Sequence, residues 1–313
     1  MIDMDISVVI PVYGCRAAIP ELYRRLICTL ESIVESFEII MVDDACPQNS
    51  WDEIVQLCQK DKRVLGIRFS RNFGQICAIT AGLNKSHGDY VVVMDCDLQD
   101  RPESIVELYN TVLEGYDVVF AKRVERQDSL ITKKLSQAFY RVYGYLTDGS
   151  FDNTICNFSI LKRKVVESYC SMREHNRAFT MFIRWLGFKE TAIALKADER
   201  FEGESSYTLG KKIKLATSII TSQSNKPLLF AVKLGFLLTL LSFLYILYLI
   251  IRHVVLGDIL VGWTTIVASI YLIGGLVIGF IGIVGIYIGN IFDEIKNRPL
   301  YVITDELNTG DDK

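Results

Sequence analysis

The hydrophobic pattern of the first part of the chain alternates between two periods. Uninterrupted apolar runs predict strands, and stretches with apolar residues three and four apart predict the helices between them. The predicted strands are residues 6–13, 37–45, 63–70, 90–97 and 117–123, and helices are predicted near 20–35, 50–59, 75–85 and 103–115. Strands without polar positions are buried on both faces, so the pattern predicts a doubly wound, mostly parallel α/β domain.

Two long apolar stretches follow. Residues 228–251 contain a single charge, Lys233, and residues 259–292 contain none. Because about 20 apolar residues suffice to cross a bilayer as a helix, each stretch predicts one transmembrane helix. The predicted organisation is therefore a domain over 1–205, a juxtamembrane segment over 206–227, helices over 228–251 and 264–288, and a cytosolic tail over 289–313.

Basic residues set the expected orientation. Four lysines, from Lys211 to Lys226, precede the first apolar stretch, and Lys296 and Arg298 follow the second. The positive-inside rule then places both termini and the large domain in the cytoplasm, at the cell (inner) membrane.

The second apolar stretch contains the small-xxx-small pairs Gly275/Gly279 and Gly285/Gly289. Such pairs allow close contact between helices. Packing against the first helix and self-association into a homo-oligomer are both open.

Charge and cysteine content narrow the function classes. The net charge of −3 gives no basic field, so nucleic acid is not an expected partner. The eight cysteines form no CxxC pair and no cluster with histidine. We expect them to be reduced and mostly buried thiols, without a disulfide framework or a zinc site.

Polar residues gather where the predicted strands end. Those residues are Pro11 and Tyr13 after the first strand, Asp43 and Asp44 after the second, Asp95 and Asp97 after the fourth, and Lys122, Arg123 and Arg126 after the fifth. A single strand-end aspartate is more often a helix cap than a ligand. The carboxyl ends of parallel strands meet at one edge, however, and ligands bind there, so the combination favours a site. No GxGxxG follows the first strand and no GxxxxGK[ST] occurs, so dinucleotide and P-loop chemistry are not expected.

The pair Asp95 and Asp97 predicts a metal. Residues two apart in a strand project to the same side, with Cys96 turned away. Two such carboxylates repel each other, and a hard divalent cation bound to substrate phosphates relieves the repulsion. Asp100, two residues into "LQDRPE", is expected to cap the next helix.

Several motifs together resemble one family. The motifs are "VVIPVYG", "IIMVDDA", "FSRNFGQICAITAGL", "MDCDLQDRPE", "AKRVER", "ERFEGESSYTLGKKIKLA", "ITSQSNKPL" and "GIYIGNIFDEIKNRPLYVI". They are similar to those of family 2 glycosyltransferases of the GT-A fold, in the subgroup that loads sugars onto polyprenyl phosphates. That subgroup includes dolichyl-phosphate mannose synthases and bacterial undecaprenyl-phosphate glucosyl- and aminoarabinosyl-transferases.

The resemblance implies a role for each matching residue. It assigns the nucleotide to Pro11, Tyr13, Asp43, Asp44, Arg71, Asn72 and Asp95, the Mg²⁺ or Mn²⁺ to Asp95 and Asp97, and catalysis to Asp97, Arg123 and Arg200. It assigns the acceptor phosphate to Arg123, Arg126, Lys133, Arg200 and Ser206. Gln99 is expected near the metal, and Ser205 and Tyr207 on the same acceptor-side loop.

The segment Cys156–Ser159 departs from the family pattern. It reads "CNFS" where relatives usually carry "GDFR", so Asn157 replaces an aspartate and Ser159 an arginine. Asn157 can coordinate a metal but cannot act as a base. A phosphate acceptor needs no base because it is already largely dianionic near neutral pH, so the change favours a lipid phosphate over a hydroxyl acceptor.

Two basic amphipathic stretches, 131–146 and 209–220, suit a membrane interface, although ordinary surface packing is the alternative for both.

"MFIRWLG", residues 181–187, resembles the QxxRW box of processive synthases, with Met181 in place of the glutamine. A processive synthase needs a channel for its product, and two transmembrane helices are too few to form one. We therefore expect Trp185 to pack against other side chains rather than to bind a polysaccharide.

The expected function is metal-dependent, inverting transfer of a sugar from a nucleotide-sugar, expected to be a UDP-sugar, to polyprenyl phosphate in cell-envelope glycan modification. Two alternatives are open. One is a transferase that extends a lipid-linked saccharide, with Asp148 or Asp152 as the base. The other is a non-catalytic membrane subunit that binds nucleotide-sugar.

Overall fold

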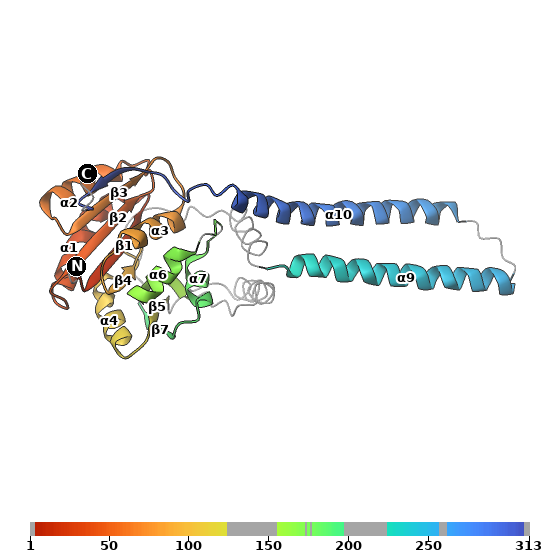
Figure 1. Cartoon of the computed structure of the whole chain (residues 1–313), viewed down its shortest axis with the longest axis horizontal. Coiled ribbons are helices and arrows are strands. Elements are labelled where there is room, and N and C mark those ends of the chain that lie inside the picture. The colour runs from red at the N-terminus through yellow and green to blue at the C-terminus, as the bar shows by residue number, and fades with distance from the viewer. Residues whose placement is uncertain are drawn as a thin grey trace. The chain divides into compact units, whose positions relative to one another are not determined.

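A computed structural model describes residues 4–123, 155–172, 174–175, 177–196, 224–256 and 262–309 (Figure 1). These residues belong to two compact units, one that contains a sheet and one that contains two long helices. The sheet unit also includes the segment that follows the second long helix.

An eight-stranded sheet forms the core of the first unit. Its strands are β1 (Ile6–Val12), β2 (Phe37–Asp43), β3 (Val64–Phe69), β4 (Tyr90–Val93), β5 (Val118–Arg123), β6 (Ile155–Lys162), β7 (Glu190–Leu195) and β8 (Ile303–Leu307). Their spatial order is β7-β5-β6-β4-β1-β2-β3-β8. The β1–β2, β1–β4, β2–β3 and β5–β7 pairs are parallel, and the pairs that involve β6 and β8 are antiparallel. The predicted mostly parallel α/β sheet is confirmed.

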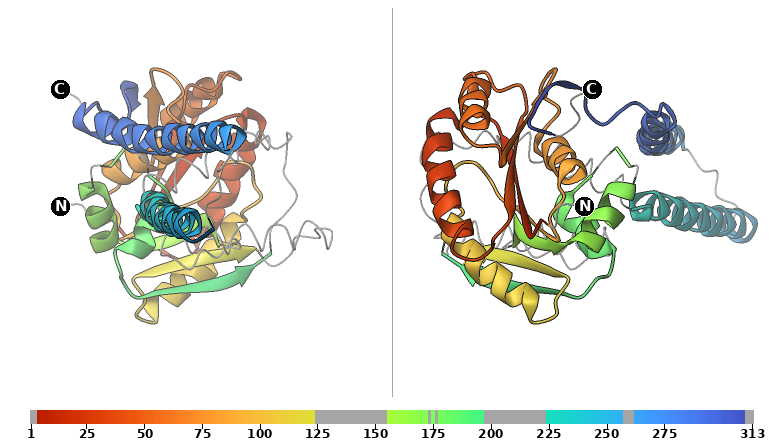
Figure 2. Two further views of the ribbon diagram at one scale, coloured as in Figure 1. Left: turned by 90° about the vertical axis from the view of Figure 1, so that its right-hand side faces the viewer. Right: turned by 60° about the vertical axis from the view of Figure 1, so that its left-hand side comes forward.

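Helices cover both faces of the sheet, as Figure 2 shows with the sheet seen near its edge. The helices are α1 (Ile19–Leu30), α2 (Ser50–Lys60), α3 (Gln75–Lys85), α4 (Ile105–Leu113), α6 (Arg163–Ser171) and α7 (Phe179–Trp185), with short 3₁₀ turns η1 (Arg16–Ala18) and η2 (Pro102–Ser104). One buried cluster contains residues of α1, α2 and α4, and the other contains residues of α3, α6 and α7. Within β1, Val8 belongs to the first cluster and Val9 to the second, as alternation along a strand requires.

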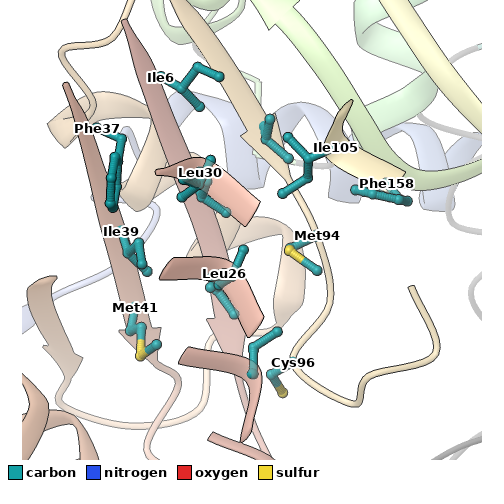
Figure 3. Packing of buried hydrophobic residues seen from close by; sticks show 14 of the residues in the cluster. Ile6, Leu26, Leu30, Phe37, Ile39, Met41, Met94, Cys96, Ile105 and Phe158 are labelled. Atoms are coloured by element: carbon teal, nitrogen blue, oxygen red, sulfur yellow. The ribbon is translucent and has the colours of Figure 1, made fainter. Parts of the chain in front are cut away.

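The first cluster packs tightly between β1, β2 and α1. Figure 3 shows Leu26 and Leu30 of α1 lying against Ile39 and Met41 of β2. All four side chains have no exposed surface. This layer fixes the strands whose carboxyl ends carry the candidate site.

The sheet includes three strands that periodicity does not predict. β6 lies between β4 and β5, and β7 lies outside β5. β8 comes from the segment after the last long helix and pairs antiparallel with β3. Within the predicted tail over 289–313, residues 289–295 belong to α10 and residues 303–307 form β8. A five-residue strand with only two apolar positions has no hydrophobic pattern that predicts it.

Side-chain contacts attach β8 to the sheet at several points. Lys85 Nζ lies 3.0 Å from Glu306 Oε2. Asn308 Nδ2 donates to the carbonyl oxygens of Cys58 and Val64 at 2.8 and 2.9 Å. Tyr301, just before the strand, stacks on Phe69 with a ring-centroid distance of 5.0 Å. The segment is therefore an integral part of this unit.

The second unit contains α9 (Lys226–Leu256) and α10 (Trp263–Ile295). Both are long and apolar enough to cross a membrane, over Lys226–Tyr245 and Ser269–Ile295. Tyr287 donates its hydroxyl to the Ser224 carbonyl oxygen at 2.6 Å. A methyl group added at any of the six glycines from Gly274 to Gly289 would meet no atom within 4 Å among the described residues, apart from the neighbouring backbone of α10 itself. Packing between α9 and α10 therefore does not account for these glycines in the described part of the chain.

The cysteine expectation is wrong at one pair. Cys15 and Cys96 form a disulfide with a Cα–Cα distance of 6.2 Å. Their separation of 81 residues gives no hint of this in the sequence. The parallel pairing of β1 with β4 is what brings the loops after these two strands together.

Candidate functional site

One edge of the sheet collects the predicted site residues. β1, β2 and β4 run parallel, and β5 runs the same way because it and β4 are both antiparallel to β6. The carboxyl ends of β1, β2, β4 and β5 therefore meet the amino end of β6. This edge is the expected position for a ligand in an α/β sheet.

Asp43 and Asp44 lie at the end of β2 and are almost completely buried, with 1% and 2% of their surface exposed. Asp43 Oδ1 accepts a hydrogen bond from the Cys46 backbone N–H at 3.2 Å, and Asp43 Oδ2 lies 3.9 Å from Arg68 Nε. Burial raises the pKa of both carboxyl groups above the ordinary aspartate value. The backbone hydrogen bonds favour the charged forms and lower the pKa, but burial is the larger effect.

Asp44 positions the loop between β3 and α3. Its two carboxylate oxygens accept the backbone N–H groups of Phe73 and Gly74 at 2.6 and 2.9 Å. Gly74 has a φ of +98°, a conformation that other residues rarely adopt. The Arg71 guanidinium lies over the Phe73 ring at 4.2 Å from its centroid. Asp44 therefore holds the segment that presents Arg71 and Asn72.

The same loop is tied to the segment that leads into β8. The Ser70 backbone N–H donates to the Val302 carbonyl oxygen at 3.0 Å. The loop is therefore held by Asp44 on one side and by a distant part of the chain on the other.

Asp95 and Asp97 follow β4, which ends at Val93. Both aspartates are partly exposed, whereas Cys96 between them is buried. Gln75 Nε2 donates to Asp95 Oδ1 at 2.6 Å, and the Gln99 backbone N–H donates to Asp97 Oδ1 at 3.2 Å. The predicted alternation is thus present, although the acids lie in the turn after the strand rather than within it.

The acid pair suits a hard divalent cation. Aspartate oxygens are the ligands that Mg²⁺ and Mn²⁺ prefer, and one or two carboxylates are usual where substrate phosphates complete the coordination. Asn157 lies near the amino end of β6, which begins at Ile155 and meets the edge where the turn with Asp95 lies. An amide oxygen at that position is chemically compatible with the same cation.

A small pocket with basic side chains lies at the carboxyl end of β5, and it was only partly predicted from the sequence. Lys122 from β5, Lys196 after β7 and Arg101 before η2 line it, together with the buried Asp100. The sequence predicts Lys122 at this edge, but it does not predict Lys196, because Lys196 follows the unpredicted β7, nor Arg101, which follows the turn after β4. The pocket brings positive side chains from three segments of the chain to one place. Asp100 was expected to cap the next helix, but no side-chain hydrogen bond caps η2 or α4.

The other predicted residues have different outcomes. Pro11 is buried in β1, Tyr13 is 49% exposed after it, and Arg123 ends β5. Several residues lie outside the described part of the chain, namely Arg126, Lys133, Asp148, Asp152, Arg200, Ser205, Ser206 and Tyr207, as do the amphipathic stretches 131–146 and 209–220. Trp185 was expected to serve packing, but it is 76% exposed because Phe179, Phe182 and Ile183 form the buried face of α7.

A solved structure shares this fold. The chain is similar to glucosyl-3-phosphoglycerate synthase from Mycobacterium tuberculosis, solved in complex with Mn²⁺, UDP-glucose and phosphoglyceric acid. The TM-score is 0.51 at 16% identity, and the match covers 70% of this chain and 78% of that one. The likeness identifies the sheet unit as a GT-A fold.

Sequence relatives match over almost the whole chain. A prophage-derived bactoprenol glucosyl transferase of Shigella flexneri is 33% identical, over 96% of this chain and 97% of the relative. An undecaprenyl-phosphate 4-deoxy-4-formamido-L-arabinose transferase of Photorhabdus laumondii is 30% identical, over 98% of this chain and 95% of the relative. Residues 7–170 match the model of glycosyl transferase family 2. The chain therefore belongs to glycosyltransferase family 2, and it is a glycosyltransferase.

Proposed function

We propose that this enzyme transfers a sugar from a nucleotide-sugar, most simply a UDP-sugar, to polyprenyl phosphate, with inversion at the anomeric carbon. The observation that carries the proposal is the pairing of Asp95 and Asp97 at the carboxyl edge of the sheet, in a chain that continues into two apolar helices. Relatives named for undecaprenyl phosphate and bactoprenol match across both parts, which supports a lipid acceptor.

The donor would bind along the edge from β2 to β4. Asp43 is buried and accepts the Cys46 backbone N–H, so we assign it to framing the pocket for the base, and the exposed Tyr13 ring to contact with the base. Asp44 acts through the loop that carries Arg71 and Asn72. Asp95 and Asp97, with Asn157, would hold a divalent cation, which supplies charge neutralisation for the departing nucleotide diphosphate.

The acceptor would bind on the opposite side of the acid pair. A phosphate monoester carries between one and two negative charges near neutral pH, so it attacks without a general base. Lys122, Lys196 and Arg101 line one small pocket together with Asp100, and the excess of positive charge there would attract and orient the phosphate. We assign Arg123, Arg126, Lys133, Arg200 and Ser206 to the same phosphate.

The membrane would present the lipid. The sheet unit includes both the strands before α9 and β8 after α10, so two crossings return the chain to the side from which it started. The lysines between Lys211 and Lys226 support the cytoplasm as that side. Nucleotide-sugars are made in the cytoplasm, which agrees with this placement.

The decisive experiment uses the purified full chain in detergent or nanodiscs. It is incubated with Mg²⁺ or Mn²⁺, radiolabelled nucleotide-sugars and undecaprenyl phosphate, and the lipid is then extracted. We expect label in a lipid that mild acid hydrolyses, as a sugar phosphodiester does. Chelation of the metal by EDTA should remove the product.

Other outcomes would replace the proposal. Transfer only onto a lipid that already carries a sugar would make the enzyme a chain-extending transferase. Nucleotide binding without transfer from any donor would indicate a non-catalytic subunit.

A further inference from the structure

A disulfide joins two loops of the candidate site. Cys15 lies three residues after the end of β1 and Cys96 lies three residues after the end of β4. Since β1 and β4 are parallel neighbours, their loops leave the sheet side by side. The bond therefore connects the loop that carries Tyr13 to the loop that carries Asp95 and Asp97.

The disulfide lies in the hydrophobic core, beneath the turn that carries Asp95 and Asp97. Cys15 and Cys96 are 4% and 6% exposed, and both belong to the buried cluster of α1 and β1. Figure 3 shows Cys96 in that cluster, near Leu26. Asp95 and Asp97 on either side of Cys96 are partly exposed. The bond thus restrains the backbone between the two carboxylates from the buried side, while the carboxylates themselves reach the surface.

We propose that Cys15–Cys96 is a reversible thiol–disulfide modification site, and that its oxidised form preorganises the two loops for the nucleotide diphosphate and its cation. The identity of that ligand and the cytoplasmic location rest on the proposed function, whereas the bond itself rests on the geometry of the two loops. Cytoplasmic disulfides are rare and are usually transient or redox-sensing. A disulfide between two loops of the site therefore indicates reversible control of ligand binding rather than a permanent structural cross-link.

Reduction of the Cys15–Cys96 bond requires a dithiol, and its formation requires a disulfide as the oxidant. A dithiol reductant attacks one of the two sulfurs, the Cys15–Cys96 bond breaks, and a mixed disulfide forms. The second thiol of the reductant then releases the protein. Two electrons and two protons have moved from the dithiol to Cys15 and Cys96. Oxidation by glutathione disulfide reverses this and yields two molecules of glutathione.

Reduction should loosen both loops. The link spans 81 residues of chain, and it is the only disulfide among the described residues. Without it, ligand binding must order the loops, and that ordering lowers affinity. We expect the dissociation constant for nucleotide diphosphate with Mn²⁺ to rise about tenfold, within the usual range for coupling between two sites.

The first measurement concerns the bond itself. The full chain is treated with glutathione disulfide or with dithiothreitol, its free thiols are blocked, and its peptides are mapped by mass spectrometry. We expect a Cys15–Cys96 peptide in the oxidised sample only. Cys46 accepts a hydrogen bond from the Gly14 backbone N–H at 3.2 Å, so it lies near the same loop. A peptide that joins Cys15 to Cys46 instead, or no linked peptide, would overturn the proposal.

The second measurement follows the loops without any substrate. Hydrogen–deuterium exchange should be at least about tenfold faster after reduction in residues 13–16 and 95–99, and unchanged in α2. Cys15→Ser and Cys96→Ser should resemble the reduced wild type under both conditions. Cys28→Ser is the matched control, because Cys28 is an exposed free thiol on α1, and it should keep the redox response.

The third measurement is titration of UDP with Mn²⁺ in both redox states. Equal affinity in both states would refute the regulatory part even if the linked peptide forms. If neither state binds UDP but exchange still responds to reduction, the proposed donor is wrong and the modification site stands.

Discussion

Acidic side chains occur at both ends of the same sheet, and they differ in what surrounds them. At the amino end, Glu38 of β2 is 3% exposed and accepts the Ser7 hydroxyl and the His87 backbone N–H, both at 2.6 Å. At the carboxyl end, Asp95 and Asp97 are partly exposed and have accessible surface. All three carboxylates accept hydrogen bonds from the chain, but that of Glu38 is buried whereas Asp95 and Asp97 reach the surface.

Asp44 shows that position alone does not separate the two classes. It lies at the carboxyl end, yet its oxygens are used by the Phe73 and Gly74 backbone, as those of Glu38 are used at the other end. A buried carboxylate that accepts backbone N–H groups positions a loop. An acid of this kind affects ligand binding only through that loop.

The largest effect is expected at Asp97. Asp97→Ala should lower transfer about a thousandfold, because several kcal/mol of charge stabilisation depend on a correctly held metal. Membrane insertion and thermal stability should be unchanged. Asp52→Ala, which removes an exposed aspartate of α2, is the control. An active Asp97 variant would show that the partly exposed acids at the carboxyl end do not bind an essential metal.

Glu38→Ala tests the opposite end. The Ser7 hydroxyl and the His87 N–H would lose their buried acceptor, which should lower the free energy of unfolding by about 2–3 kcal/mol. Thermal melting of the full chain measures this loss, with Glu35→Ala at an exposed position as control. The kcat of the protein that remains folded should not change. A specific loss of kcat would mean that the amino end also participates in catalysis.

Gln75→Ala should have a smaller effect. Gln75 orients Asp95 by the 2.6 Å hydrogen bond from its side-chain amide, and it lies at the start of α3. Its loss should raise the Mn²⁺ concentration for half-maximal activity severalfold, about 1 kcal/mol for one hydrogen bond, with little change in kcat at saturating metal. Gln59→Ala, at an exposed position of α2, should change neither quantity.

The smallest effect is a pH dependence at Asp43. Burial raises its pKa in the folded state, so the folded chain binds more protons than the unfolded chain between the ordinary and the raised pKa. Stability contributed by this group therefore falls as pH rises through that window. Asp43→Asn should gain stability relative to wild type as pH rises, measured by thermal melts in a pH series. A constant difference across pH would exclude a raised pKa.

Hydrophobic periodicity predicted the strands and helices up to residue 123 because each element there buries a regular apolar face. It missed β6, β7 and β8, since pairing with a distant strand, rather than local pattern, stabilises them. Asp43, Asp44, Asp95 and Asp97 were predicted because strand ends in parallel sheets meet at one edge. Gln75, Lys196 and the Cys15–Cys96 bond were not, because they depend on distances between loops that no sequence spacing encodes.

The position of β8 has a consequence for biosynthesis. Its partner β3 is made early, but β8 leaves the ribosome only after α9 and α10. Until then the backbone groups of β3 on that side have no strand partner, and an open edge of this kind invites pairing between nascent chains. Completion of the sheet is therefore delayed until both hydrophobic helices have been synthesised, which makes stalled or truncated translation products candidates for aggregation and proteolytic clearance.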